Sequence, residues 1–97
     1  MKSLGMIEVS GVTGAIDCLD IMCKSADVEF VTWERKLGGR LVTVVVQDNV
    51  SAVTAAVENA VANGIVKPCA HAVIASPHEE TWRILQISAA RIAQKGR

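Results

Sequence analysis

The chain has 97 residues, of which ten are basic and ten are acidic, so its formal net charge is zero. A neutral chain gives no electrostatic reason to expect binding to nucleic acid or to an anionic membrane surface. Its length suits one domain, and because aromatic residues make up only 3% of it, the core must be mainly aliphatic.

The first predicted elements are a strand at residues 4–9 and a helix at residues 14–26. Polar residues recur along this helix and its end at intervals of three and four positions, which is typical of one narrow solvent-facing stripe: Asp17, Asp20, Lys24 and Asp27. The other helix residues are apolar or small, and 51% of the whole chain is apolar. We therefore expect neighbouring subunits to cover part of the surface.

Two further strands, at residues 28–37 and 41–46, flank a turn that contains Gly38-Gly39. Glycine adopts positive φ without steric cost, so this pair predicts a two-residue hairpin of type I′ or II′. Cationic residues lie on both sides of the glycines. One such turn makes only weak, screened interactions in water, whereas copies around a symmetry axis would line a hole with positive charge.

The second half of the chain predicts a helix at residues 50–62, capped by Asp48-Asn49 and ended by Asn63-Gly64. A short strand at residues 70–74 follows. The sequence Ser76-Pro77-His78-Glu79 spells a capping box with proline at the first helical position, before a tail that predicts one or two short helices.

The order of these elements is strand, helix, strand, strand, helix, strand. It predicts an α/β (α+β) fold of ferredoxin-like topology, in which two main helices back four strands and a short helical tail follows.

No catalytic or metal-binding machinery is visible in the sequence. Cys69 and His71 share one face of a strand, but two ligands are too few for a structural metal site. Cys18 and Cys23 point to different sides of their helix, and all three cysteines are expected to be buried, reduced thiols. No signal peptide or membrane-spanning segment is readable, so we expect a cytoplasmic protein without metal, cofactor or enzymatic activity.

Several separated motifs carry a resemblance to a known family: Leu4-Gly5-Met6-Ile7-Glu8, Ala15-Ile16-Asp17, Asp20-x-Met22-x-Lys24-Ser25-Ala26, Lys36-Leu37-Gly38-Gly39, Leu41-Val42-Thr43-Val44-Val45-Val46 and Val73-Ile74-Ala75-Ser76-Pro77-His78. Together they resemble the hexameric, single-domain shell proteins of bacterial microcompartments (the BMC-H type). The resemblance implies a BMC fold with an antiparallel sheet, a shell domain at residues 1–80 and a helical tail at residues 81–97. It also implies a location in the shell of a cytoplasmic microcompartment.

The family assembles as flat tiles of six copies, with a pore on the six-fold axis for small polar metabolites. Other shell proteins at the tile edges and the enclosed enzymes are the implied partners. The turn that matches the pore consists of Lys36, Leu37, Gly38, Gly39 and Arg40, with Gly39 at the narrowest point. Arg40 replaces the family's usual glycine. It could point along the pore or lie back on a neighbour; we expect it to splay outward and make the pore mouth positive.

The residues that match the tile edge are Lys24, Asp27, Ser76 and His78. In the family, the lysine at the position of Lys24 crosses the boundary between tiles. Ser76 stands where the usual arginine would be, so one edge hydrogen bond is missing. This difference implies weaker tiling, a minor shell component or mixed tiles, whereas hexamer formation is not affected.

Two alternatives of other classes are compatible with the sequence. A small regulatory ligand-binding domain of ACT-like topology would use the apolar excess as a dimer interface. A redox or metal carrier would use the cysteines, although none of them lies in the turn at residues 36–40.

Overall fold

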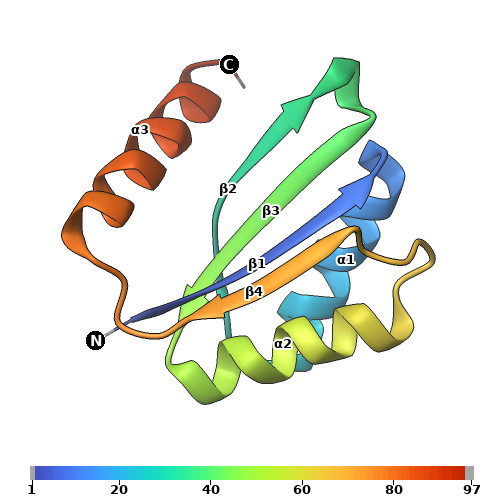
Figure 1. Cartoon of the computed structure of the whole chain (residues 1–97), viewed down its shortest axis with the longest axis horizontal. Helices are drawn as coiled ribbons and strands as arrows, with labels where there is room; N and C mark the ends of the chain where they lie inside the picture. The colour runs from blue at the N-terminus through green and yellow to red at the C-terminus, as the bar shows by residue number, and fades with distance from the viewer. Residues whose placement is uncertain (1, 96–97) are drawn as a thin grey trace.

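The computed structural model describes residues 2–95 and contains one four-stranded antiparallel sheet with the strand order β2-β3-β1-β4 (Figure 1). The elements in chain order are β1 (Ser3–Ser10), α1 (Val12–Ser25), β2 (Glu29–Lys36), the 3-10 turn η1 (Leu37–Gly39), β3 (Leu41–Asp48), α2 (Val50–Asn63), β4 (Ala70–Ile74) and α3 (Glu79–Lys95). The predicted fold class is therefore confirmed. The two central strands are β1 and β3.

The main core lies between one face of the sheet and helices α1 and α2, which pack against each other. Alternate residues of β3 point into this core, namely Val42, Val44 and Val46, and all three are fully buried. Strand β1 adds Ile7 and Val9 from the same face. This alternation is the period of two expected of a β-strand.

The other face of the sheet is covered in part by α3, which packs against β2 (Figure 1). Here Thr32 of β2 is fully buried and its Oγ1 lies 2.8 Å from Oγ of Ser88 on α3. A hydroxyl pair of this kind can be buried because each oxygen has a hydrogen-bond partner. Helix α3 is thus attached to the domain through a polar contact in addition to apolar packing.

An irregularity in β2 decides which residues face α3. The register against β3 shifts between Phe30, which lies opposite Val46, and Thr32, which lies opposite Val45. Regular pairing would place Thr32 opposite Val44 on the core side. The extra residue instead places each following side chain of β2 on the opposite face of the sheet. The bulge therefore sends Thr32 to α3 and Trp33 to the core.

The helix ends agree only in part with the sequence predictions. Asn49 caps α2 as predicted, because its Oδ1 accepts a hydrogen bond of 2.8 Å from the N–H of Ala52. Gly64 ends α2 with an extended backbone (φ −63°) and not with the left-handed conformation typical of a C′ glycine. Glycine is nevertheless required there, since a Cβ would lie 2.8 Å from the carbonyl oxygen of Ala60.

The predicted capping box before the last helix is wrong. Ser76 has a positive φ of 50° and lies outside the helix, which begins at Glu79. His78 caps it instead, with Nδ1 accepting a hydrogen bond of 3.1 Å from the N–H of Glu80. The tail is one 17-residue helix, where one or two short helices were predicted.

The predicted division between residues 80 and 81 falls within α3 and stays a prediction. Met1 of the predicted shell domain, and Gly96 and Arg97 of the predicted tail, lie outside the described residues. Within residues 2–95, no helix combines the length and apolar character needed to cross a bilayer.

Candidate functional site

The turn between β2 and β3 lies at one tip of the molecule (Figure 1). The strands pair as far as Lys36 opposite Leu41, which leaves residues 37–40 as the connection. The predicted two-residue hairpin is therefore wrong. Three consecutive residues have positive φ, 54° at Leu37, 66° at Gly38 and 90° at Gly39. Both glycines therefore adopt the positive φ that was predicted for them.

The turn is attached to the junction between β1 and α1. The N–H of Gly11 donates a hydrogen bond of 3.0 Å to the carbonyl oxygen of Arg40. On the same side, a Cβ at Gly39 would lie 3.2 Å from Cγ2 of Val12, so the backbone of the turn approaches that side chain closely. These two contacts fix the position of a segment that would otherwise be a free loop.

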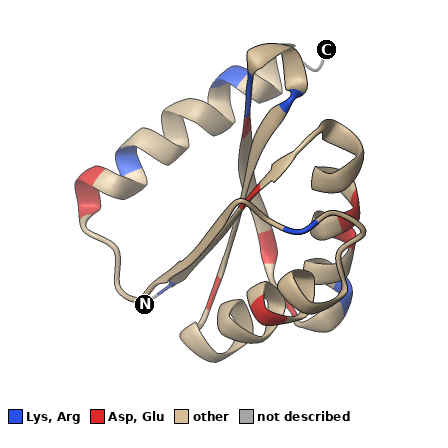
Figure 2. Ribbon diagram, turned by 45° about the vertical axis from the view of Figure 1, so that its right-hand side comes forward, with Lys and Arg blue, Asp and Glu red and all other residues tan. Residues whose placement is uncertain are grey.

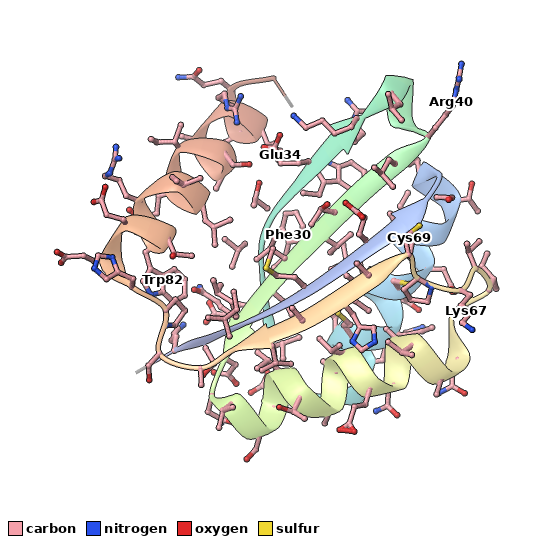
Figure 3. All side chains as sticks on the ribbon, in the orientation of Figure 1. Phe30, Glu34, Arg40, Lys67, Cys69 and Trp82 are labelled. Carbon is pink, nitrogen blue, oxygen red and sulfur yellow. The ribbon has the colours of Figure 1, made fainter. Side chains whose placement is uncertain are left out.

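Basic residues lie at this tip, at the turn ends of β2 and β3 (Figure 2). Arg35 lies on the core side of β2 with its guanidinium carbon 5.7 Å from the ring centre of Trp33, a cation–π distance. Lys36 Nζ lies 3.8 Å from Oε1 of Glu34. The Arg40 side chain is exposed and points away from the body of the protomer (Figure 3).

The positions matched to a tile edge are all exposed: Lys24, Asp27, Ser76 and His78. Lys24 pairs within its own helix, with Nζ 2.8 Å from Oδ2 of Asp20. This hydrogen bond and the charge of Asp20 raise the pKa of Lys24 above its ordinary value. An exposed pair one helical turn apart is weak, and Lys24 can exchange Asp20 for another acceptor at little cost.

The cysteines do not form a site within the described residues. Cys18 is buried, and burial, together with the charge of Asp17, raises the pKa of its thiol. Cys23 and Cys69 are exposed, so the expectation of buried thiols is wrong for these two. In residues 2–95, no group of three or more His, Cys, Asp or Glu side chains is arranged to hold a metal ion.

Comparison with known proteins assigns the family. A family model described as the BMC domain matches residues 3–77 of the chain. The chain belongs to the BMC-domain family. It is similar to the bacterial microcompartment shell protein PduA of Citrobacter freundii, with 43% identity over 86 residues that cover 87% of this chain and 91% of that protein. The carboxysome shell protein CsoS1C of Hydrogenovibrio crunogenus is 41% identical over 91 residues, covering 88% of this chain and 85% of that protein.

A solved structure supports the fold of this BMC-domain protein. It is described as a microcompartments protein from Desulfitobacterium hafniense DCB and has a TM-score of 0.78 over 91% of this chain. At 20% identity the likeness shows the fold alone, and the present chain spans 48% of that longer chain. The resemblance seen in the sequence is thus confirmed, and the ACT-like alternative is not favoured.

One residue of the turn region was not singled out from the sequence of this BMC domain. Glu34 lies within reach of Lys36 on its own strand and of Ser88 and Arg91 on α3. The spacing of Glu34 and Lys36 places them on one face of a strand, but only the docking of α3 and the bulge in β2 show which face that is.

The attachment of the turn to Val12 predicts different costs for the two glycines of the turn. We expect Gly39→Ala to lower the free energy of unfolding by about 2 kcal/mol, because it adds a close contact to an unfavourable backbone conformation. Gly38→Ala should cost less, about 1 kcal/mol, because its Cβ would meet open space and only the left-handed backbone conformation is unfavourable. Denaturant unfolding at equal protomer concentration measures both losses.

The double variant Val12→Ala with Gly39→Ala is the matched control. In the Val12→Ala background, Gly39→Ala should lower the free energy of unfolding by about as much as Gly38→Ala does, because the crowding methyl group is gone. Equal losses at the two glycines in the presence of Val12 would contradict the contact.

Proposed function

We propose that the chain is a structural subunit of a bacterial microcompartment shell, and not an enzyme, which assembles with other shell proteins. The BMC-domain match and the relatives that are named as microcompartment and carboxysome shell proteins support this proposal. The fold is consistent with it, because one rigid sheet carries two helices on one face and a third on the other.

The oligomer that we propose is a ring of six copies, in which the turns meet at a central pore. The observation that carries this proposal is the turn itself: it is at the tip of the molecule, fixed by Gly11 and Val12, and bears Lys36 and Arg40. Large apolar side chains are exposed on several elements of the protomer: Ile16, Phe30, Val50, Ile65, Val73 and Ile74. Contacts between copies would remove such surface from water.

The solutes that we propose for the pore are small polar metabolites, which would pass the residues Lys36 to Arg40. Arg40 splays outward in this proposal and makes the pore mouth positive, since its side chain points away from the protomer (Figure 3). The enzymes enclosed by the shell would be further partners.

The edge between tiles, in this proposal, is formed by Lys24, Asp27, Ser76 and His78. Their exposure and the weak hold of Asp20 on Lys24 leave them available to a neighbouring tile. The tail at residues 81–97 would be an addition to a shell domain at residues 1–80. Its helix lies beyond the part of the chain that the family model matches.

The edge assignment predicts a separation of ring formation from tiling. We expect Lys24→Ala to leave the ring intact and to abolish extended sheets, because the ammonium group that crosses the boundary is lost. Native mass spectrometry reports the ring, and negative-stain electron microscopy reports the sheets. Lys67→Ala, at another exposed lysine, is the matched control. Normal sheets of the Lys24 variant would remove Lys24 from the edge.

The pore assignment predicts that charge at Arg40 controls permeation. We expect Arg40→Glu to lower the ratio of anion to cation permeability several-fold, because it reverses one charge in each copy at the pore mouth. Reversal potentials across a planar bilayer that holds the assembled protein, under a KCl gradient, give this ratio. Arg83→Glu, on α3, is the control and should leave the ratio unchanged. If Arg40→Glu also has no effect, Arg40 does not line the pore.

A further inference from the structure

Glu34 connects the turn with the C-terminal helix. Its Oε2 accepts hydrogen bonds from the hydroxyl of Ser88 and, at 3.2 Å, from the guanidinium of Arg91, both on α3. Its Oε1 lies 3.8 Å from Nζ of Lys36, the first residue of the proposed pore turn. Figure 3 shows Glu34 in the space between β2 and α3. One carboxylate thus contacts a cation of the turn and two donors outside it.

The donors on α3 are themselves held in position. Ser88 is almost fully buried, and its hydroxyl is also hydrogen-bonded to Thr32 of β2, which has no exposed surface. A buried polar contact of this kind specifies one arrangement of the two elements, because any shift would leave a hydroxyl without a partner. The carboxylate of Glu34, half-buried beside this pair, is therefore fixed near Lys36 to a degree that a free surface glutamate would not be.

The charge at the tip depends on this carboxylate. The turn region contains three cations, Arg35, Lys36 and Arg40. Glu34 contacts Lys36 at 3.8 Å and also pairs with the cation Arg91 of α3 at 3.2 Å. The distance between Glu34 and Lys36 is well within the Debye length of about 8 Å at physiological ionic strength, so salt screens one charge from the other only in part. An ion near the turn therefore experiences the combined field of these charges.

We propose that Glu34 is a specificity-determining residue of the pore. Its carboxylate, positioned by Ser88 and Arg91, offsets the charge of Lys36 and so limits the preference of the pore for anions. This inference rests on the proposed function of the turn. It gives α3 a role in permeation at a distance from the pore, because the helix holds the residue that sets the charge there.

The test is the Glu34→Gln variant, assembled as the full-length protein and compared with the wild type by reversal potential under a KCl gradient. Glutamine keeps the shape and can still accept from Ser88 and Arg91, whereas the charge is lost. We expect the ratio of anion to cation permeability to rise about twofold or more, because one negative charge per copy is removed beside the pore turn.

The matched control is Glu29→Gln. Glu29 lies on the same strand, also pairs with a lysine, Lys2, and is at the end of β2 remote from the turn. Glu29→Gln should leave the ratio of anion to cation permeability unchanged. In about 1 M salt, where the Debye length is about 3 Å, the difference between Glu34→Gln and wild type should shrink, whereas a change caused by altered packing would persist.

Lys36→Gln separates failure of this inference from failure of the pore assignment. If Lys36→Gln lowers the ratio and Glu34→Gln leaves it unchanged, the role of Glu34 is overturned and the pore stands. If Lys36→Gln and Arg40→Glu both leave the ratio of anion to cation permeability unchanged, the turn does not line the pore. The pore assignment and the role of Glu34 are then both overturned. If Glu34→Gln does not assemble while Glu34→Asp does, the carboxylate is needed for assembly, and the assignment to permeation is overturned.

Discussion

The pairing of β2 with β3 is the constraint on which the functional part of the molecule depends. Its end, Lys36 opposite Leu41, sets the length of the turn, and the shift between Phe30 and Thr32 sets which side chains face α3. Without that extra residue, the same sequence would direct Glu34 into the aliphatic core, where an unpaired carboxylate is costly. The irregularity in β2 therefore determines on which face of the sheet the charged group beside the turn lies.

The four strands, the two main helices and their order along the chain were predictable because they follow from local sequence patterns. The β-branched run at residues 41–46 could only be a strand shielded on both faces, and it is a central strand of the sheet. The capping of α2 by Asn49 was also predictable, because it involves only residues that are close in the sequence. The edge and pore residues were singled out by resemblance, and their roles stay predictions, although all the edge positions are exposed as such roles require.

What could not be predicted depends on tertiary contacts. The bulge in β2 has no local signature, and Leu37 adopts a positive φ that β-turn rules assign to glycine. His78 displaced Ser76 as the cap of α3 because the chain turns at Ser76 before the helix begins. The exposure of Cys23 and Cys69 and the contacts of Glu34 likewise appear only once distant elements are packed together.

A chain with no net charge can still carry a strong local field, because the cations of β2 and the turn gather at one tip. If several copies placed this tip around one rotation axis, the pore between them would have a positive potential. Cryo-electron microscopy of the purified assembly tests this most directly. We predict a six-fold ring in which Gly39 of every copy is among the residues nearest the axis. A ring in which these turns lie at the outer rim, or an assembly without a rotation axis near them, would contradict the proposal.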